Sequence, residues 1–316
     1  MLVLVTGATG FLGRRVVREL QERRHNVRCL VHTPGGERLF SAPTPDIYYG
    51  NVTDTEALAE AAIGVDIVIH LVAIIRQRRR ITFETINHQG TANVLAAAKR
   101  SGVKHFIHVS AAGVTNDVQF RYLYSKWQGE QEVINSGLPY TILRPTLMFG
   151  PGDEFLNTLA GLARISPLLP VAGPGRNRYQ PIAVEDVARC LALSVDRQDL
   201  KGKTLDIGGP DQLSYNEIVS IVIRTLGKRC WRLHVPMWLM QLATLWLQLV
   251  QPRPAVTVDQ LRMLGIRNVA ETGMVEQTFG FTPRTVEGNI DFVRSVTVAD
   301  GWKIAMGIPP ARVRGH

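Results

Sequence analysis

The chain has few cysteines and no long uncharged apolar run, and both shortages limit what it can be. Its 316 residues include 3 cysteines, Cys29, Cys190 and Cys230, without a C-x-x-C pair or nearby histidines. This spacing fits neither a disulfide framework nor a zinc site, so we expect reduced cysteines, as in the cytoplasm. The longest uncharged apolar runs fall short of the about 18 residues of a membrane span, and the N-terminus enters an apolar strand directly. We therefore expect neither a spanning helix nor a secretory signal.

Acidic residues are also in short supply. The sequence has 36 Lys and Arg against 27 Asp and Glu, a net charge of +9. Such a balance favours an anionic partner, which could be a phosphate-bearing cofactor, an anionic membrane surface or nucleic acid. The basic residues are dispersed except at Arg76-Gln77-Arg78-Arg79-Arg80, and no aromatic stacking module accompanies them. We therefore expect no nucleic acid partner; the basic cluster is either a solvated loop or a binding patch.

A glycine-rich turn stands near the start of the chain. Residues 6–13 read Thr-Gly-Ala-Thr-Gly-Phe-Leu-Gly, after an apolar run at 2–5 and before a helical apolar pattern at 14–20. In a strand–turn–helix unit, glycines permit the sharp turn, the close approach of backbone to a pyrophosphate, and the packing of helix on strand. The spacing G-x-x-G-x-x-G is one residue longer in its first gap than the usual dinucleotide fingerprint. We interpret it as a dinucleotide-binding turn; the alternative is a plain β–α turn.

No carboxylate follows the second expected strand, at 27–31, before Gly36. An Asp or Glu at that place would bind the 2′-hydroxyl of NAD. His32 and Thr33 stand there instead. Basic residues close in sequence, or expected close in space, are Arg14, Arg15, Arg28 and Arg38. Positive charge without a carboxylate suits a 2′-phosphate, so we favour NADP(H) over NAD(H); alternatively, these arginines are solvated.

Strands and helices alternate through the first 150 residues. Further strands are expected at 46–50, 66–73 and 104–109, and helices from residue 55, capped by Thr53 or Asp54, and at 82–99. This cadence predicts an α/β fold, a Rossmann-type doubly wound parallel sheet. After residue 150 a smaller mixed domain is expected, which interleaves with the sheet. We therefore divide the chain into an NAD(P)-binding domain, 1–150, and a C-terminal domain, 151–316. The C-terminal segment should contain helices at 154–165, 184–194 and 214–226 and a strand at 204–207. Ser214 is the expected N-cap of the last helix, with Glu217 at the capping-box position.

Three side chains suit proton transfer. Ser110 ends the fifth strand at the carboxyl edge of the sheet, where open α/β folds bind ligands. Tyr122 and Lys126 are four residues apart and share one face of a helix. A lysine cation lowers the pKa of a nearby phenol, which equips tyrosine for general acid catalysis. Tyr124 is offset by two residues and points away from Lys126. The alternative is an ordinary amphipathic helix.

These landmarks, in this order, resemble the extended and atypical short-chain dehydrogenase/reductases. The family order also includes Asn87 with Gly90-Thr91, Arg144-Pro145, residues 180–188 and residues 205–210. The segments 10–14, 121–123 and 235–238 are similar to one atypical branch, the NADPH-binding accessory subunit of respiratory complex I and its bacterial relatives. The resemblance is strong over residues 1–150 and extends over nearly the whole chain.

The resemblance implies roles for individual residues. Gly7, Gly10, Gly13 and Arg14 would bind the cofactor phosphates, Val52 and Asp54 the adenine, Ala73 the adenosine side, and Lys126 the nicotinamide ribose. The full set of implied cofactor contacts is Gly7, Thr9, Gly10, Phe11, Leu12, Gly13, Arg14, His32, Val52, Asp54, Leu71, Ala73, Lys126 and Pro145. Two positions depart from the family pattern. Ser110 is followed by Ala111-Ala112 instead of further hydroxyls, and Asn51 replaces an acid in the adenine motif.

Three functions remain open at this point. The chain could be an NAD(P)-dependent oxidoreductase acting on an unidentified carbonyl or quinone, with Ser110, Tyr122 and Lys126 as its catalytic residues. It could instead be a nucleotide-stabilised accessory protein of a membrane respiratory or quinone-linked assembly. A sugar-nucleotide epimerase or dehydratase is the third, although no sugar-nucleotide motif is recognisable.

An uncharged apolar helix is expected at 236–250. It contains two tryptophans, and its polar side chains, Gln241, Thr244 and Gln248, form one narrow stripe. At this length it is too short to span a bilayer, which takes about 20 residues. The basic residues that flank it are Lys228, Arg229, Arg232 and Arg253. We expect it to contact a membrane or membrane protein, as a peripheral helix on the cytoplasmic face; the alternative is a core helix of the smaller domain.

Overall fold

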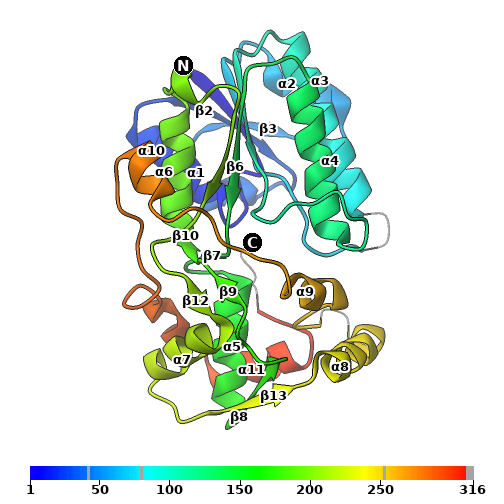
Figure 1. Cartoon of the computed structure of the whole chain (residues 1–316). Helices are drawn as coiled ribbons and strands as arrows, with labels where there is room; N and C mark the ends of the chain where they lie inside the picture. The colour runs from blue at the N-terminus through cyan, green and yellow to red at the C-terminus, as the bar shows by residue number, and fades with distance from the viewer. Residues whose placement is uncertain (41–42, 79–80, 252–253, 311–316) are drawn as a thin grey trace. The chain divides into compact units, whose positions relative to one another are not determined.

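A computed structural model describes residues 1–40, 43–78, 81–251 and 254–310. The chain forms two compact units, coloured along the sequence in Figure 1. Unit 1 comprises Met1–Pro145, Val184–Ile207 and Gln277–Phe281. Unit 2 comprises Thr146–Ala183, Gly208–Glu276 and Thr282–His316. Of the basic residues named from the sequence, Arg79, Arg80 and Arg253 lie outside the described residues.

Unit 1 is built on a 7-stranded parallel sheet in the order β11-β6-β5-β4-β1-β2-β3. Its strands are β1 (Leu2–Thr6), β2 (Asn26–Val31), β3 (Asp46–Tyr49), β4 (Ile67–His70), β5 (His105–Val109), β6 (Tyr140–Pro145) and β11 (Lys203–Ile207). The order reverses between β1 and β4, and open α/β sheets bind ligands outside the carboxyl ends of the strands at such a point. The predicted α/β, doubly wound class is confirmed. β4 is shorter than the expected 66–73, because the chain leaves the ladder after His70.

Helices cover both faces of this sheet (Figure 1). On one face α1 (Gly13–Glu22) packs against α6 (Val184–Ser194), and on the other α3 (Gln89–Arg100) packs against both α2 (Thr55–Ala62) and α4 (Arg121–Asn135). The helix expected at 82–99 begins as a π-helical turn, η2 (Glu84–His88), before α3. The remaining short elements are η1 (Gly36–Leu39), η3 (Gln198–Leu200) and α10 (Met274–Phe279). Asp54 caps α2 as predicted, accepting from the Ala57 amide at 3.1 Å.

Unit 2 combines helices with three two-stranded ladders. The ladders pair β7 (Met148–Phe149) with β10 (Ile182–Ala183), β9 (Arg178–Tyr179) with β12 (Leu213–Ser214), and β8 (Leu168–Ala172) with β13 (Trp231–Val235). The helices are α5 (Glu154–Ile165), α7 (Tyr215–Thr225), α8 (Met237–Val250), α9 (Val258–Met263), η4 (Asp291–Ser295) and α11 (Val298–Ala305). The expected cap of α7 is confirmed: Ser214 and Glu217 form a reciprocal capping box.

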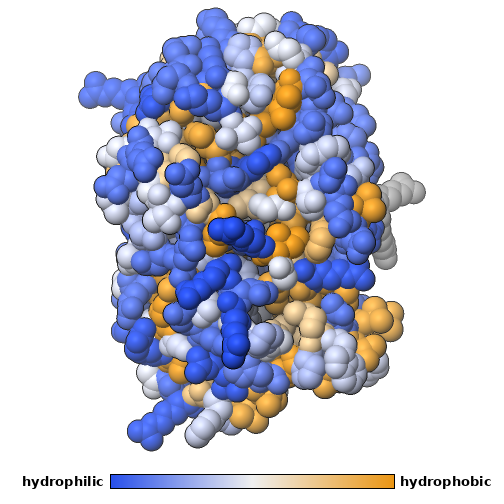
Figure 2. Space-filling view, viewed as in Figure 1, coloured by the Kyte–Doolittle hydropathy of each residue, from blue (hydrophilic) through white to orange (hydrophobic). Residues whose placement is uncertain are grey.

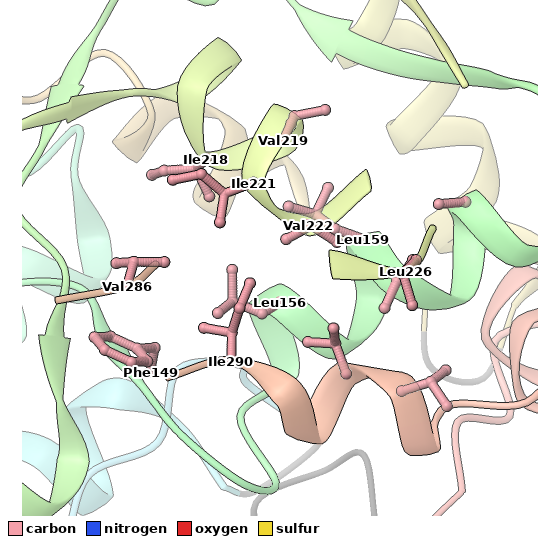
Figure 3. Close-up of a cluster of buried hydrophobic side chains, with 14 of the residues drawn as sticks. Phe149, Leu156, Leu159, Ile218, Val219, Ile221, Val222, Leu226, Val286 and Ile290 are labelled. Carbon is pink, nitrogen blue, oxygen red and sulfur yellow. The ribbon is translucent and has the colours of Figure 1, made fainter. Parts of the chain in front are cut away.

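The core of unit 2 lies between α5, α7 and the segment around η4 (Figure 3). Leu156 and Leu159 of α5 meet Ile218 and Val222 of α7, and Ile290 closes the cluster. Amphipathic spacing along α5 and α7 directs these residues inward. α8 contributes one buried residue, Thr244. Within the described residues, no helix has the length and apolarity needed to cross a membrane.

Candidate functional site

The glycine turn joins β1 to α1 with almost no room for side chains. Gly7 has a φ of +77°, and a Cβ there would lie 3.1 Å from the Val72 amide nitrogen. A Cβ on Gly13 would lie 2.1 Å from the Gly7 carbonyl oxygen, closer than any real contact. The turn is closed by the Gly10 amide, which donates to the Gly7 carbonyl at 3.1 Å. Only glycine fits positions 7 and 13, which leaves the backbone open for the close approach of an anionic ligand at the start of α1.

Two adjacent arginines follow the turn and have different surroundings. Arg15 pairs with Glu185 of α6 at 2.8 Å, and its guanidinium stacks on the Phe11 ring. The Arg14 Nε is buried and has no hydrogen-bond partner among the described residues. Burial, and then the charge of Arg15, lowers the pKa of Arg14. Arg14 is therefore the cation that fits a pyrophosphate beside the turn.

The structure corrects the group of arginines expected around the 2′ position. Arg28 donates to Asp46 at 2.7 Å and to the Ala61 and Ile63 carbonyls. Because Asp46 is the first residue of β3, the Arg28 guanidinium lies toward the amino ends of the strands. The carboxyl ends, where open α/β sheets bind ligands, are at the opposite edge. Arg15 is likewise engaged elsewhere, by Glu185. Both ion pairs join residues far apart in the sequence, so no local pattern shows them.

At the carboxyl end of β2, His32, Thr33 and Arg38 are exposed. The structure also places a carboxylate here that sequence reasoning passed over. Glu37 lies in η1, and its Oε2 accepts from the Gly35 amide at 2.8 Å. A Cβ on the intervening Gly36 would lie 3.1 Å from the Thr9 Cγ2, so this turn adjoins the glycine turn. The acidic Glu37 and the basic Arg38 thus stand next to each other after β2.

Further implied cofactor contacts lie at or after the carboxyl ends of β3, β4 and β6. Val52 is buried and lies against Gly90, where an added Cβ would be 2.6 Å from the Val52 Cγ2. Leu71 and Val72 pass directly beside Gly7, and the Leu71 amide donates to the Thr6 carbonyl at 3.1 Å. Ala73 is exposed two residues further on. Pro145 ends β6. Because all these strands are parallel, their carboxyl ends share one edge of the sheet.

Ser110, Tyr122 and Lys126 belong to the same edge. Ser110 directly follows β5, and its Oγ is buried without a hydrogen-bond partner among the described residues. Lys126 on α4 is buried, and its Nζ donates to the Val109 carbonyl at 2.7 Å. The Tyr122 ring meets Phe83 edge-on with centroids 5.9 Å apart. Tyr124 instead stacks on Trp127, with ring centroids 5.8 Å apart.

The electrostatics of this pair differ from the expectation. Burial raises the pKa of Tyr122 to about 12, instead of Lys126 lowering it. Burial lowers the pKa of Lys126 to about 8, while the nearby Glu130 opposes that change.

Behind these residues runs a buried chain of hydrogen bonds. His70 Nδ1 lies 2.7 Å from Thr6 Oγ1, and His70 Nε2 lies 3.1 Å from Thr91 Oγ1. Thr91 donates its single hydroxyl proton to the Asn87 carbonyl at 2.7 Å. It must therefore accept from His70, so His70 is neutral with its proton on Nε2. The Asn87 amide continues the chain to Ser125 at 3.0 Å.

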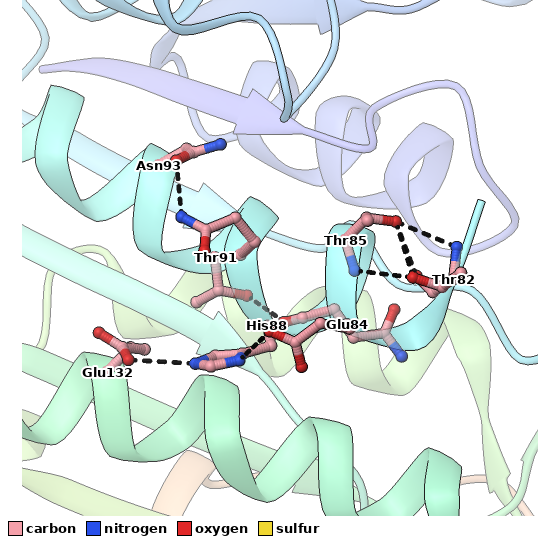
Figure 4. Close-up of polar contacts among 9 residues, drawn as sticks. Thr82, Glu84, Thr85, His88, Thr91, Asn93 and Glu132 are labelled. Carbon is pink, nitrogen blue, oxygen red and sulfur yellow. Dashed lines mark hydrogen bonds and ion pairs between the residues drawn. The ribbon is translucent and has the colours of Figure 1, made fainter. Parts of the chain in front are cut away.

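In the π-helical turn η2, Asn87 is buried, whereas its neighbour His88 is partly exposed and lies among polar contacts (Figure 4). His88 lies between two carboxylates, with Nδ1 2.8 Å from Glu84 and Nε2 3.1 Å from Glu132 of α4. Thr82 and Thr85 bond each other's backbone and side chains at the start of the turn. These contacts fix η2 against α4, and Asn87 can then hold the Ile74 amide at 2.8 Å as well as Ser125.

The buried histidines were not singled out from the sequence. His70 and His108 interrupt apolar strands that otherwise consist of branched and aromatic residues. That interruption was the available signal, because parallel strands covered on both faces are expected to be continuously apolar.

Comparison with known proteins agrees with this geometry. A family model described as NAD(P)H-binding matches residues 7–197. The chain is 30% identical over 234 residues to NADH dehydrogenase (ubiquinone) 1 alpha subcomplex subunit 9, mitochondrial, of Arabidopsis thaliana, covering 70% of this chain and 57% of that protein. It is 33% identical over 190 residues to ceramide reductase of Caulobacter vibrioides, covering 60% of this chain and 59% of that protein. The chain thus matches less than two thirds of the length of either relative.

Among solved structures, the NADPH-dependent quinone oxidoreductase of Escherichia coli, complexed with NADPH, matches with a TM-score of 0.73. The match covers 93% of this chain and 98% of that one, at 17% identity. At that identity the match shows a shared fold. Together these findings confirm the resemblance drawn from the sequence.

Proposed function

The chain belongs to the NAD(P)H-binding family, and from this premise we propose that it is an NADPH-dependent oxidoreductase of the atypical short-chain dehydrogenase/reductase type, acting at a membrane on a carbonyl or quinone. The observation that carries the proposal is the shared edge of the sheet. The glycine turn, Arg14, Ser110 and the Tyr122–Lys126 pair all follow or adjoin the carboxyl ends of parallel strands. A cofactor bound along that edge would bring its reactive ring to the only buried hydroxyl–lysine group there among the described residues.

Each of these groups then has one role in the proposed reaction. The glycine turn and Arg14 hold the pyrophosphate by backbone amides and charge. NADPH, when bound, supplies the hydride. Ser110 Oγ, which is buried and unpartnered, holds the substrate oxygen, and Tyr122 donates the proton that this oxygen needs after reduction. The Lys126 ammonium bonds the nicotinamide ribose and favours the ionised form of Tyr122 once its proton has left.

The cofactor preference is tested by isothermal titration with NADPH and NADH. We expect tighter binding of NADPH, and a selective loss of that advantage in Arg38→Ala, since Arg38 is the exposed arginine after β2. Glu37→Gln is the matched change of the neighbouring side chain and should increase the preference, because it removes the negative charge. Equal affinity for the two nucleotides in the wild type would refute the assignment.

A second candidate, a nucleotide-stabilised accessory protein without turnover, is favoured by the raised pKa of Tyr122, about 12, and by the alanines after Ser110. The similarity to a named respiratory subunit supports it as well. The two functions are separated by Tyr122→Phe. In an oxidoreductase this change lowers turnover about a hundredfold and leaves NADPH affinity unchanged. If a panel of quinones and carbonyls is never reduced by the wild type, the accessory function replaces catalysis.

The proposed membrane contact rests on α8, where large apolar side chains are exposed to solvent and a polar side chain is buried. Trp238 and Trp246 are each 63% exposed and Leu249 is 79% exposed, whereas Thr244 is 4% exposed. Most apolar side chains of α8 therefore face outward, Thr244 faces the protein and Gln241 is partly buried, an exposure pattern that does not favour the alternative of a core helix. Figure 2 shows hydrophobic side chains gathered at the lower right, over α8 as Figure 1 labels it. Such patches mark contact with a membrane or a partner.

Charge around α8 favours an anionic lipid surface on the cytoplasmic side. Lys228, Arg229 and Arg232 precede the helix and are exposed. Each basic residue near an anionic surface contributes about 1 kcal/mol, and the tryptophans suit the headgroup region. Flotation with anionic liposomes tests this. The wild type should float, the double variant Trp238→Glu with Trp246→Glu should not, and Ile63→Glu, an equally exposed apolar position in unit 1, should float like the wild type. A wild type that stays at the bottom at low salt would refute it.

A further inference from the structure

Three neighbouring strands place polar side chains in one row of the sheet interior. Thr6 of β1 pairs in register with His70 of β4, which pairs with His108 of β5. Residues two apart on a strand share a face, so these three lie one row nearer the edge than the apolar row of Leu4, Val68 and Phe106. All three polar residues are fully buried. Thr6 and His70 are hydrogen bonded, as described above.

His108 is different. Its ring stacks on His70 with centroids 5.4 Å apart, yet neither ring nitrogen has a hydrogen-bond partner among the described residues. A buried polar atom left unsatisfied is costly, and native proteins usually satisfy such atoms, often with ordered water. The His108 ring therefore needs a hydrogen-bond partner that the neighbouring side chains do not provide.

Lys126 is the buried charged group that contacts the residue next to His108. It is buried, its Nζ has three donors, and one of them reaches the Val109 carbonyl, in the residue next to His108. Its charge lowers the pKa of both His70 and His108, after burial, so the ammonium lies within electrostatic reach of both rings. The other charged group that acts on Lys126 is Glu130 of the same helix, which pairs with Arg144.

We propose that one buried water bridges Lys126 Nζ to a ring nitrogen of His108, and that His108 is a positioning residue that keeps the buried Lys126 ammonium solvated. The ammonium donates to the water, and the water donates to the lone pair of the neutral imidazole. Water suits this place because it can make about three hydrogen bonds in one small polar site. The task of Lys126 rests on the proposed function, whereas the water site does not.

The test combines a crystal structure with a direct titration of Lys126. A high-resolution structure of the nucleotide-free wild type should show an ordered water within hydrogen-bond distance of both Lys126 Nζ and a His108 ring nitrogen. NMR of lysines labelled at Cε, with the Lys126 signal identified by its loss in Lys126→Met, then measures the pKa of Lys126. In His108→Phe, which keeps an aromatic ring against His70, that pKa should fall by about one unit or more, since a charge-assisted hydrogen bond is lost.

His105→Phe is the matched control. His105 is a buried histidine on the same strand, but it lies three residues away on the opposite face and bonds Thr141 at 2.9 Å. It should leave the pKa of Lys126 unchanged. An unchanged pKa in His108→Phe, or a wild-type structure without the bridging water, overturns the proposal, and the structure alone decides if His108→Phe does not fold. Neither readout uses NADPH, so a failure of the proposed function would be seen separately in the nucleotide titration.

Discussion

The two units depart from the usual distribution of polar and apolar residues in opposite places. Unit 1 buries Thr6, His70 and His108 of its sheet, and Lys126 of α4. Unit 2 has an apolar core, with the Asp153 carboxyl buried at the start of α5, and it exposes the leucines and tryptophans of α8. The most unusual residues of unit 1 are thus buried polar side chains, and those of unit 2 are exposed apolar side chains.

This contrast indicates where each unit is specialised. A buried ammonium and unsatisfied imidazole are unfavourable for folding, as is an apolar helix in water. Sequences keep such features mainly at functional sites, because elsewhere all levels of structure agree. Ligand binding should accordingly belong to the interior of unit 1 and surface binding to the exterior of unit 2, each separable by substitution.

The largest expected effect comes from Gly13→Ala. The new Cβ would lie 2.1 Å from the Gly7 carbonyl oxygen and 2.7 Å from Ala8, so the turn must open. We expect NADPH binding to be lost, with an affinity at least about a hundredfold lower, because the backbone no longer approaches the pyrophosphate. Liposome binding through α8 should remain. Isothermal titration and flotation on the same preparation measure both.

Gly265→Ala is the control for that change, since its Cβ would meet nothing closer than 3.5 Å. It should alter neither property. Simultaneous loss of nucleotide and lipid binding in a folded Gly13→Ala protein would show that the two functions are not separable.

A second prediction uses opposite responses to pH. Burial raises the pKa of Asp153, in unit 2, to about 7, against about 4 in an unfolded chain. The folded state then binds more protons between about pH 4 and 7, so its stability falls as pH rises through that window. Burial lowers the pKa of His70 to about 3 and of His105 to about 4, both in unit 1. Those groups make stability fall as pH drops below about 6.5.

Asp153→Asn isolates the unit 2 contribution, because asparagine still caps α5 but carries no charge. The free energy of unfolding of the variant, relative to that of the wild type, should increase by on the order of 2 kcal/mol when the pH is raised from 5 to 8. Urea denaturation at the two pH values measures this. A difference between variant and wild type that does not change with pH would contradict the buried, protonated carboxyl.

A third prediction concerns the buried chain of unit 1. Thr91→Val keeps the shape of the side chain but leaves the His70 Nε2 proton and the Asn87 carbonyl without this partner. The free energy of unfolding should fall by about 1–3 kcal/mol. Thr244→Val, at a buried threonine of α8 for which no hydrogen bond is recorded among the described residues, should cost less than about 0.5 kcal/mol. Equal losses in the two variants would mean that the buried chain contributes nothing specific.

The sequence predicted what depends on local signals. The strand–turn–helix at Gly7–Gly13, the Asp54 cap and the Ser214–Glu217 capping box each follow from residues within a few positions of one another. Alternation of strands and helices gave the parallel sheet, and a parallel sheet by itself places Ser110 and the turn on one edge.

Contacts between distant segments could not be predicted in the same way. Arg15 pairs with Glu185, which is 170 residues away in the sequence, and His70 lies beside His108 because of the register between β4 and β5. In α8 the stripe formed by Gln241, Thr244 and Gln248 was visible in the sequence. Periodicity shows that polar residues share a side, but not whether that side faces water or protein.

The smallest effect is expected at Gln248, where hydrophobicity and hydrogen bonding make opposite predictions. Gln248 Oε1 accepts from the Val258 amide at 3.0 Å, in the first turn of α9, where helical amides lack partners of their own. Gln248→Leu makes α8 more apolar but removes that acceptor, so the free energy of unfolding should fall by about 1 kcal/mol. Leu242→Gln, on the exposed side, should leave stability within about 0.5 kcal/mol and weaken liposome flotation. Urea denaturation and flotation of both variants measure the two effects, and a Gln248→Leu protein as stable as the wild type would mean that the polar stripe does not anchor α8 to unit 2.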